Sequence, residues 1–180
     1  KGTRMKADVF PGEGSQSTTG SVQANRVSLV AENLGSAEFK AEYNLRYAYL
    51  AGSMYKGISS KELVVRMGKA GYLSFLGAGG LNLESVETQL QYVTAHLHQG
   101  EPFGGNLLSN LKDVSAELEL VKLYIRYGVR YVEASAFMQI SPAIVYYRLM
   151  ALERGSDGKV LSKRKLIAKI SRPEVATAFL

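Results

Sequence analysis

Three polar residues lie at or near the ends of apolar segments of the sequence, namely Asn106, Glu133 and Lys169. The side chain of Asn106 offers a donor and an acceptor, which suits the edge of a heterocyclic ligand and equally suits a simple turn. An unpaired carboxylate among apolar residues is costly, so we expect Glu133 to have a partner or a chemical task. Two interpretations of Lys169 stay open, an ion pair with Glu133 or a functional cation at the end of its segment.

Two short segments of small residues also follow apolar segments. The sequence is GSMYKG from Gly52 to Gly57 and GAGG from Gly77 to Gly80. Small residues in the first segment would let a flat ligand approach the backbone. The second segment is not a G-x-G-x-x-G motif followed by a suitably spaced acidic residue, so a tight turn is favoured over a dinucleotide-binding loop. A further pair, Gly104 and Gly105, interrupts an apolar segment and predicts a β-bulge.

Five predicted strands alternate with predicted helices. The strands span residues 47–51, 72–76, 103–108, 129–134 and 165–169. The helices begin at the capping box Ser59-x-x-Glu62, at Asn82, near residue 115, at Ser141-Pro142 and at Ser171-x-x-Glu174, and the fourth of them extends to about residue 152. This alternation predicts an α/β fold with right-handed βαβ units and a parallel sheet. A doubly wound sheet and a (β/α)8 barrel remain as alternatives, and both bind ligands at the carboxyl ends of their strands.

The composition excludes several classes of protein. The chain has no cysteine, which excludes disulfides and thiolate chemistry and fits a cytoplasmic location. No apolar segment is long enough to form a membrane span. The net charge of +6 suits an acidic ligand such as a phosphate-bearing cofactor, but only residues 163–165 form a tight basic group, so no nucleic-acid binding is expected. His96 and His98 fall on a polar helix face, and we expect no metal site there.

Two regions differ in sequence character. Residues 1–36 are rich in Gly, Ser, Thr and Asn without a sustained period, which predicts a flexible leader or linker ahead of a domain at 37–180. Within this leader the segment VFPGEGSQ at 9–16 resembles the start of malonyl-type acyltransferases. No G-x-S-x-G nucleophile elbow follows it, so acyl transfer is not expected.

Four blocks of the sequence resemble one enzyme family. They are YLAGSMYKGISSKELVVRMGKAGYLSFLGAGGL, GGNLLSN, GVRYVEASAFMQISPAIVYYRL and IAKISRPEVA, and they occur in the family's order and spacing between about residues 34 and 180. They are similar to the N-terminal part of the trans-acting enoyl reductases of bacterial polyketide and polyunsaturated fatty-acid synthases. This family belongs to the wider nitronate monooxygenase-like group of FMN-dependent TIM barrels. The resemblance implies an NADPH-using flavoprotein that reduces enoyl thioesters held by acyl carrier protein domains.

The resemblance also assigns site residues by position. Gly52, Ser53, Met54 and Tyr55 match the loop beneath the flavin ring, Gly77, Ala78 and Gly79 match a second loop, and Asn106, Glu133 and Lys169 complete the cofactor site. Asn106 and Lys169 are the implied catalytic residues. A positive charge on Lys169 near the pyrimidine edge of the flavin would stabilise the negative charge that the ring acquires on reduction.

Two features of the sequence define the alternatives to this interpretation. The nitronate-oxidising branch has a histidine at the end of its fourth strand, whereas residues 133–137 contain none, which makes a nitronate monooxygenase-like oxidase the weaker alternative. A complete (β/α)8 barrel takes about 250 residues and binds phosphate after its last strands, so we expect this chain to supply about the first five βα units only. The first alternative is therefore a non-catalytic half-barrel that pairs with a partner chain or with itself.

Overall fold

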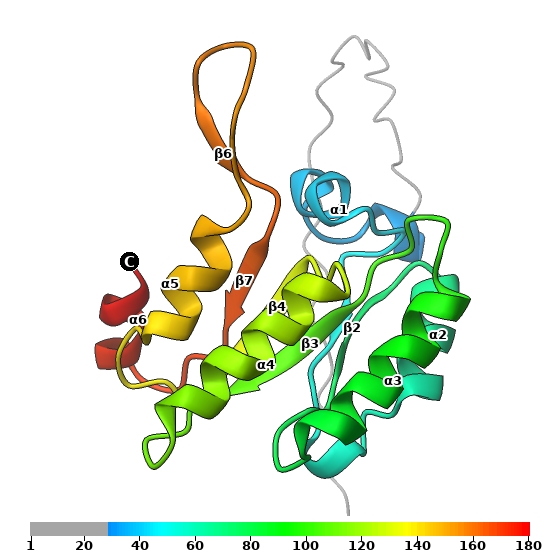
Figure 1. The fold of residues 1–180 in the computed structure, drawn as a ribbon. Coiled ribbons are helices and arrows are strands. Elements are labelled where there is room, and N and C mark those ends of the chain that lie inside the picture. Colours follow the sequence, from blue (N-terminus) through cyan, green and yellow to red (C-terminus); the bar gives the residue numbers. More distant parts are fainter. Residues whose placement is uncertain (1–28) are drawn as a thin grey trace, which may run out of the picture.

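The computed structural model describes residues 29–180, in which five parallel strands form one sheet (Figure 1). The strands are β1 (Leu50–Ala51), β2 (Leu73–Leu76), β3 (Gly104–Leu108), β4 (Tyr131–Ser135) and β7 (Lys165–Ala168). The helices that follow them are α2 (Lys61–Lys69), α3 (Leu83–His96), α4 (Val114–Arg126), α5 (Pro142–Leu149) and α6 (Pro173–Phe179). The five predicted strands are confirmed, although β1 is shorter than residues 47–51. The acyltransferase-like segment at 9–16 lies outside the described residues.

The strand order distinguishes between the two predicted architectures. Each strand of the sheet pairs in parallel with the strand of the next βα unit, in the order β1-β2-β3-β4-β7. A doubly wound sheet would contain a point where this order reverses and would carry helices on both faces. Here the order never reverses, and α2, α3, α4 and α5 lie along one face of the sheet (Figure 1). The arrangement is that of a barrel wall.

Apolar residues pack on both faces of this wall. The larger cluster lies between the sheet and the helices, and the smaller one lies on the inner face and comprises Leu45, Leu73, Phe75 and Tyr131. The short helix α1 (Ala37–Tyr43) contributes to the inner cluster, because the ring of Tyr43 lies 5.3 Å from that of Tyr131. Tyr131 is the first residue of β4, so α1 covers the inner core at the amino ends of the strands. The opposite, carboxyl ends stay open to ligands.

Gly104 and Gly105 do not form the predicted bulge. The register of β3 against β4 is unbroken along the whole of β3. The two glycines instead admit an aromatic ring on each face of the strand. A Cβ atom at Gly104 would lie 2.5 Å from the ring of Phe75, and one at Gly105 would lie 2.5 Å from the ring of Tyr124. Close packing, and not an irregular backbone, therefore explains both residues.

The predicted capping box of α2 is wrong by one residue. The side chain of Ser60, not that of Ser59, accepts a hydrogen bond from the Leu63 N–H. Ser59 is buried, and its hydroxyl oxygen accepts from the Met54 N–H at 2.7 Å. The first serine of the pair thus holds the preceding loop, and the second begins the helix. The predicted cap of α3 is confirmed, because the Asn82 side-chain oxygen accepts a hydrogen bond from the Ser85 N–H at 2.8 Å.

The segment between α5 and β7 differs most from the prediction. A protruding hairpin of β5 (Leu152–Arg154) and β6 (Val160–Ser162) occupies it (Figure 1). An Asp-Gly pair, Asp157-Gly158, lies between the two strands, and this dipeptide is a turn signal that the prediction from strand–helix alternation left out. Further on, α6 begins after Arg172 and has no side-chain cap, so the predicted capping role of Ser171 is wrong.

The end of the predicted leader contacts the domain. Residues 31–33 form a single 3-10 turn, η1 (Ala31–Asn33), and Glu32 accepts hydrogen bonds from the Arg46 guanidinium at 2.8 Å and from the Tyr47 hydroxyl at 3.1 Å. Within residues 29–180 no helix combines the length and the apolar character that crossing a membrane requires.

Replacing Gly105 with alanine is expected to lower the free energy of unfolding by about 1–3 kcal/mol, because the added methyl group overlaps the Tyr124 ring. In a Tyr124→Leu background the same replacement should cost less than about 1 kcal/mol, since the ring is then absent. Urea denaturation of the parent, the two single variants and the double variant measures this coupling. Equal costs in both backgrounds would contradict the packing explanation.

Candidate active site at the carboxyl ends of the strands

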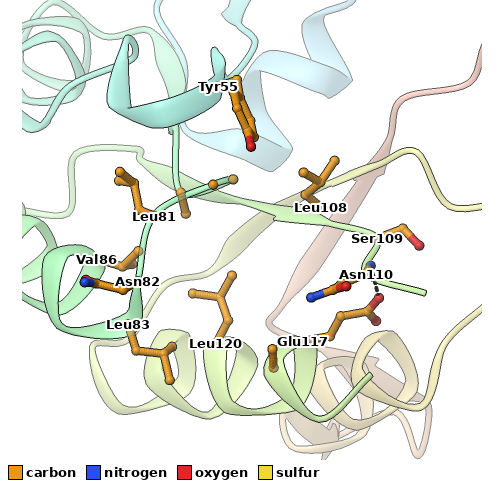
Figure 2. A pocket seen from close by; sticks show the side chains of 14 residues that line it. Tyr55, Leu81, Asn82, Leu83, Val86, Leu108, Ser109, Asn110, Glu117 and Leu120 are labelled. Carbon is orange, nitrogen blue, oxygen red and sulfur yellow. Dashed lines mark hydrogen bonds between the residues drawn. The ribbon is translucent and has the colours of Figure 1, made fainter. Parts of the chain in front are cut away.

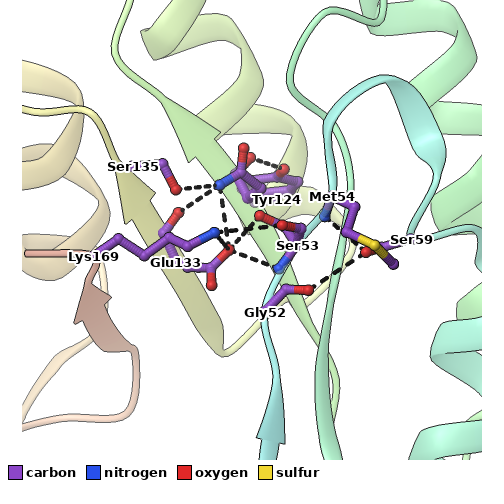
Figure 3. A network of polar contacts seen from close by, with 9 residues as sticks. Gly52, Ser53, Met54, Ser59, Tyr124, Glu133, Ser135 and Lys169 are labelled. Carbon is purple, nitrogen blue, oxygen red and sulfur yellow. Dashed lines mark hydrogen bonds and ion pairs between the residues drawn. The ribbon is translucent and has the colours of Figure 1, made fainter. Parts of the chain in front are cut away.

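The carboxylate of Glu133 lies at the centre of a polar network (Figure 3). Glu133 is 2% exposed, and its Oε2 atom accepts hydrogen bonds from the Ser53 N–H at 2.9 Å and from the Ser53 hydroxyl. The Asn106 amide reaches the same oxygen at 3.4 Å, and the Lys169 ammonium reaches it at 3.5 Å. Ser53, Asn106 and Lys169 come from the β1, β3 and β7 units of the sheet. All three contact the same atom on β4, Glu133 Oε2.

Of the two interpretations left open for Lys169, the ion pair with Glu133 is present in the structure, at 3.5 Å. Besides the carboxylate, the Lys169 ammonium contacts the Ser53 carbonyl oxygen at 3.4 Å. The side chain of Lys169 is 47% exposed, whereas that of Glu133 is 2% exposed. The pair therefore joins a buried anion to a cation that still has free surface at the strand ends. Lys169 satisfies Glu133 and remains available to a ligand.

Asn106 is fixed by its backbone and by its amide group. The Tyr124 hydroxyl donates to the Asn106 carbonyl oxygen at 2.6 Å, and burial raises the pKa of Tyr124 above the usual range, so that the phenol remains a donor. The Asn106 amide nitrogen donates to the Ser135 hydroxyl at 2.7 Å and to the Glu133 carbonyl oxygen at 3.2 Å. Among the described residues none donates to Asn106 Oδ1, which leaves an acceptor for a ligand.

The loop of small residues after β1 packs against the loop after β2. The Lys56 N–H donates to the Gly79 carbonyl oxygen at 2.8 Å. The Gly57 N–H donates to the Gly77 carbonyl oxygen, also at 2.8 Å. A Cβ atom at Gly77 would lie only 2.0 Å from the Met54 carbonyl oxygen. Much of the need for small residues therefore comes from two backbones that approach each other closely.

Gly52 faces the network. A Cβ atom there would lie 3.0 Å from Glu133 Oε1 and 3.7 Å from the Lys169 ammonium. Any side chain at this position would crowd the ion pair. This contact is a second reason, independent of a ligand, for glycine at the end of β1.

A groove lies beside the network, between the loop after β2 and the amino ends of α3 and α4 (Figure 2). Its volume is about 390 Å³, and Tyr55, Ala78 and Gly79 are among its lining residues. The groove and the network are neighbours, because a Cβ atom at Gly79 would lie 3.2 Å from Asn106 Oδ1. The structure thus gathers Gly52, Ser53, Asn106, Glu133 and Lys169 in the network and Tyr55, Ala78 and Gly79 in the groove. Their assignment to a cofactor stays a prediction.

Three residues near the site were missed at the level of sequence. Ser135 lies two positions after Glu133, so the alternation of a strand places both on one face. Glu117 and Tyr124 belong to an i, i+4, i+7 series with Val121 on α4, and all three are buried. Because Glu117 falls within an apolar stripe at helical spacing, the sequence pattern could have predicted that its carboxylate is buried.

The network fits the pyrimidine edge of a flavin. That edge alternates carbonyl oxygens with an N–H donor, so it needs a cation or a donor next to an acceptor. Lys169 supplies a half-exposed cation, and Asn106 Oδ1 supplies an acceptor to which no described residue donates. Lys169 and Asn106 are thus the cation and the acceptor that a flavin edge requires.

The chain is similar to several synthase proteins, although no protein-family model matches it. It is 47% identical over 155 residues to the polyketide biosynthesis protein PksE of Bacillus subtilis, covering 86% of this chain and 20% of PksE. It is 38% identical over 148 residues to a polyunsaturated fatty acid synthase protein of a Thraustochytrium species, covering 82% of this chain and 10% of that protein. The crystal structure of the enoyl reductase domain of MlnA, from the macrolactin biosynthesis cluster of Bacillus amyloliquefaciens, aligns with a TM-score of 0.81 and 42% identity over 83% of this chain.

This chain is a homologue of the MlnA enoyl reductase domain. The predicted resemblance is confirmed, and the five parallel strands of this chain form part of a TIM barrel. The chain covers 34% of the MlnA domain and a fifth or less of the two curated relatives, at 20% and 10%.

In this protein, Glu133→Ala should lower the free energy of unfolding by about 2–4 kcal/mol, because Ser53, Asn106 and Lys169 all lose a partner. The control is Glu119→Ala, which breaks the exposed Glu119–Lys122 ion pair and should cost less than about 1 kcal/mol. Chemical denaturation of both variants measures the two costs. Similar costs for the two variants would show that the network does not stabilise the strand ends.

Proposed function

We propose that this protein is a trans-acting, FMN-dependent enoyl reductase of a polyketide or polyunsaturated fatty-acid synthase. It uses NADPH to reduce the double bond of enoyl thioesters held by acyl carrier protein domains, and it works in the cytoplasm. The observation that carries the proposal is the group of Lys169, Asn106 and Glu133 at the strand ends of a chain that is 42% identical to an enoyl reductase domain. Ligands of TIM barrels bind at this end of the strands.

The residues of the network have distinct roles in this proposal. FMN, when bound, supplies the hydride carrier between NADPH and the enoyl group. Lys169 holds a positive charge at the pyrimidine edge of the ring, and Asn106 Oδ1 accepts a hydrogen bond from the ring N–H. Glu133 contacts both residues and thereby sets their positions relative to each other.

One further candidate function has an observation in its favour. Among residues 29–180, β1 and β7 are the edges of the sheet, and each has a strand partner on one side only. A half-barrel module would cover such edges with a partner chain or a second copy, without any need for a flavin. A nitronate-oxidising activity has less support, because residues 133–137 at the end of β4 contain no histidine.

The role of Lys169 can be tested in the full-length protein. The Lys169→Met variant should keep bound FMN and slow flavin reduction by NADPH roughly tenfold, because losing a charge contact of about 1.4 kcal/mol changes a rate by that factor. Lys165→Met is the matched control, since it removes the same charge from the first residue of β7, the strand that Lys169 directly follows, at the opposite end of the barrel.

Anaerobic stopped-flow absorbance gives the reduction rate, and the visible flavin band gives the FMN content. Equal reduction rates in the two variants would show that Lys169 is only structural. A parent protein without any flavin band would favour the half-barrel module over the reductase.

A further inference from the structure

A second carboxylate is buried close to the network, at Glu117 on α4. Glu117 is 4% exposed, and its Oε1 atom accepts a hydrogen bond from the Asn110 N–H at 2.6 Å. Its Oε2 atom has essentially no surface open to water and accepts no hydrogen bond, and no lysine, arginine or histidine among residues 29–180 forms an ion pair with the side chain. A buried acceptor without a donor is costly and uncommon.

Glu117 belongs to the lining of the groove of about 390 Å³ (Figure 2). The walls are mostly apolar and are formed by Leu81, Leu83, Val86, Leu108 and Leu120, with the ring of Tyr55 at one side. Ser109 and Asn110 form the rim next to Glu117 and begin the connection between β3 and α4, and residues 111–113 of this connection are exposed. Because Oε2 has essentially no exposed surface, a guest in the groove reaches it only if part of the surrounding lining moves.

The charges, hydrogen-bonding groups and apolar side chains of the lining limit which ligand the groove can bind. The amino ends of α3 and α4 both border the groove, an arrangement that by itself favours anions. The Glu117 carboxylate opposes an anion and requires a hydrogen-bond donor. The apolar walls require a guest that is mostly aliphatic. An elongated, uncharged chain that carries N–H groups satisfies both requirements.

The groove leads to the proposed active site. Gly79 lines the groove and also approaches Asn106 Oδ1, to which a Cβ atom would come within 3.2 Å. Gly80 has a positive φ of 78°, and a Cβ atom there would lie 2.4 Å from the Tyr55 ring, so this ring packs directly against the glycine backbone. A chain lying in the groove would therefore reach the strand ends beside Asn106 by passing the Tyr55 ring, which separates the groove from the network.

We propose that the groove binds the pantetheine-type arm of the enoyl thioester substrate and that Glu117 Oε2 accepts an amide N–H of that arm. The proposal rests on the proposed function, which supplies a thioester of this class. The arm is aliphatic, uncharged between its ends and interrupted by amide groups. Bound in this way, it places the thioester at the network and its far end at the outer rim of α3 and α4.

The test compares Glu117→Gln with Glu119→Gln in the full-length protein. In Glu117→Gln, one side-chain oxygen can still accept from Asn110, while an NH₂ group replaces the free acceptor and repels an N–H of the arm. Glu119→Gln removes the same charge from an exposed position on the same helix. Each variant is assayed with an enoyl pantetheine thioester and with the S-ethyl thioester of the same acid, which has no amide. Isothermal titration calorimetry with pantetheine measures binding without any reaction.

The expected result is a KM for the pantetheine thioester that rises about 10- to 100-fold in Glu117→Gln, with kcat and the S-ethyl thioester unaffected. Pantetheine affinity should fall by the same factor, and Glu119→Gln should behave as the parent. A second variant, Leu83→Trp, adds bulk at a half-exposed position of the groove lining and should weaken pantetheine binding without altering the Glu117 contacts.

Two outcomes overturn the proposal. They are pantetheine binding that neither Glu117→Gln nor Leu83→Trp alters, and a loss in Glu117→Gln that is equal for both thioesters. Failure of the proposed function is distinguishable, because the parent would then reduce neither thioester while calorimetry still reported binding that depends on Glu117.

Discussion

A buried carboxylate must be matched by donors, and Glu133 obtains them from three other strands, from Asn106 on β3 and from Ser53 and Lys169 just after β1 and β7. This requirement connects the fold to the site. Ser53, Asn106 and Lys169 come from different βα units, and each of them reaches the same carboxylate oxygen. Because β4 is bordered by β3 and β7, displacement of either strand would separate donors from Glu133. The same contacts that satisfy the buried charge also place a cation and an amide acceptor next to each other.

Close backbone packing is the second constraint on this end of the barrel. Gly77 allows the loop after β1 to lie directly against the loop after β2, and Gly105 allows the Tyr124 ring to reach the strand and donate to Asn106. Both glycines are therefore explained by close contacts within the protein, without a ligand. The ligand surface that results has two connected parts, a polar network at the strand ends and an apolar groove that ends in Glu117. A substrate with a reactive head and a long arm suits that combination.

Sequence patterns predicted the strands well and the details of their ends poorly. Glycine and polar residues mark where each strand stops, so the five parallel strands and the pairing of Glu133 with Lys169 could be inferred. The adjacent serines 59 and 60 are both good caps, and only tertiary contact assigns one to the loop and the other to α2. The role of Gly105 depends on Tyr124, which is distant in sequence, and no local pattern reports such packing. The choice between a doubly wound sheet and a barrel also depended on strand order, which periodicity does not encode.

The most direct test of the account is a single turnover of the full-length protein under anaerobic conditions. One equivalent of NADPH is added, followed by an enoyl pantetheine thioester, while the visible spectrum is recorded and the thioester is identified by mass spectrometry. The account predicts a flavin band that NADPH bleaches and the thioester restores, with one saturated thioester formed per flavin. A protein that contains no flavin, or a reduced flavin that the thioester does not reoxidise, would contradict it.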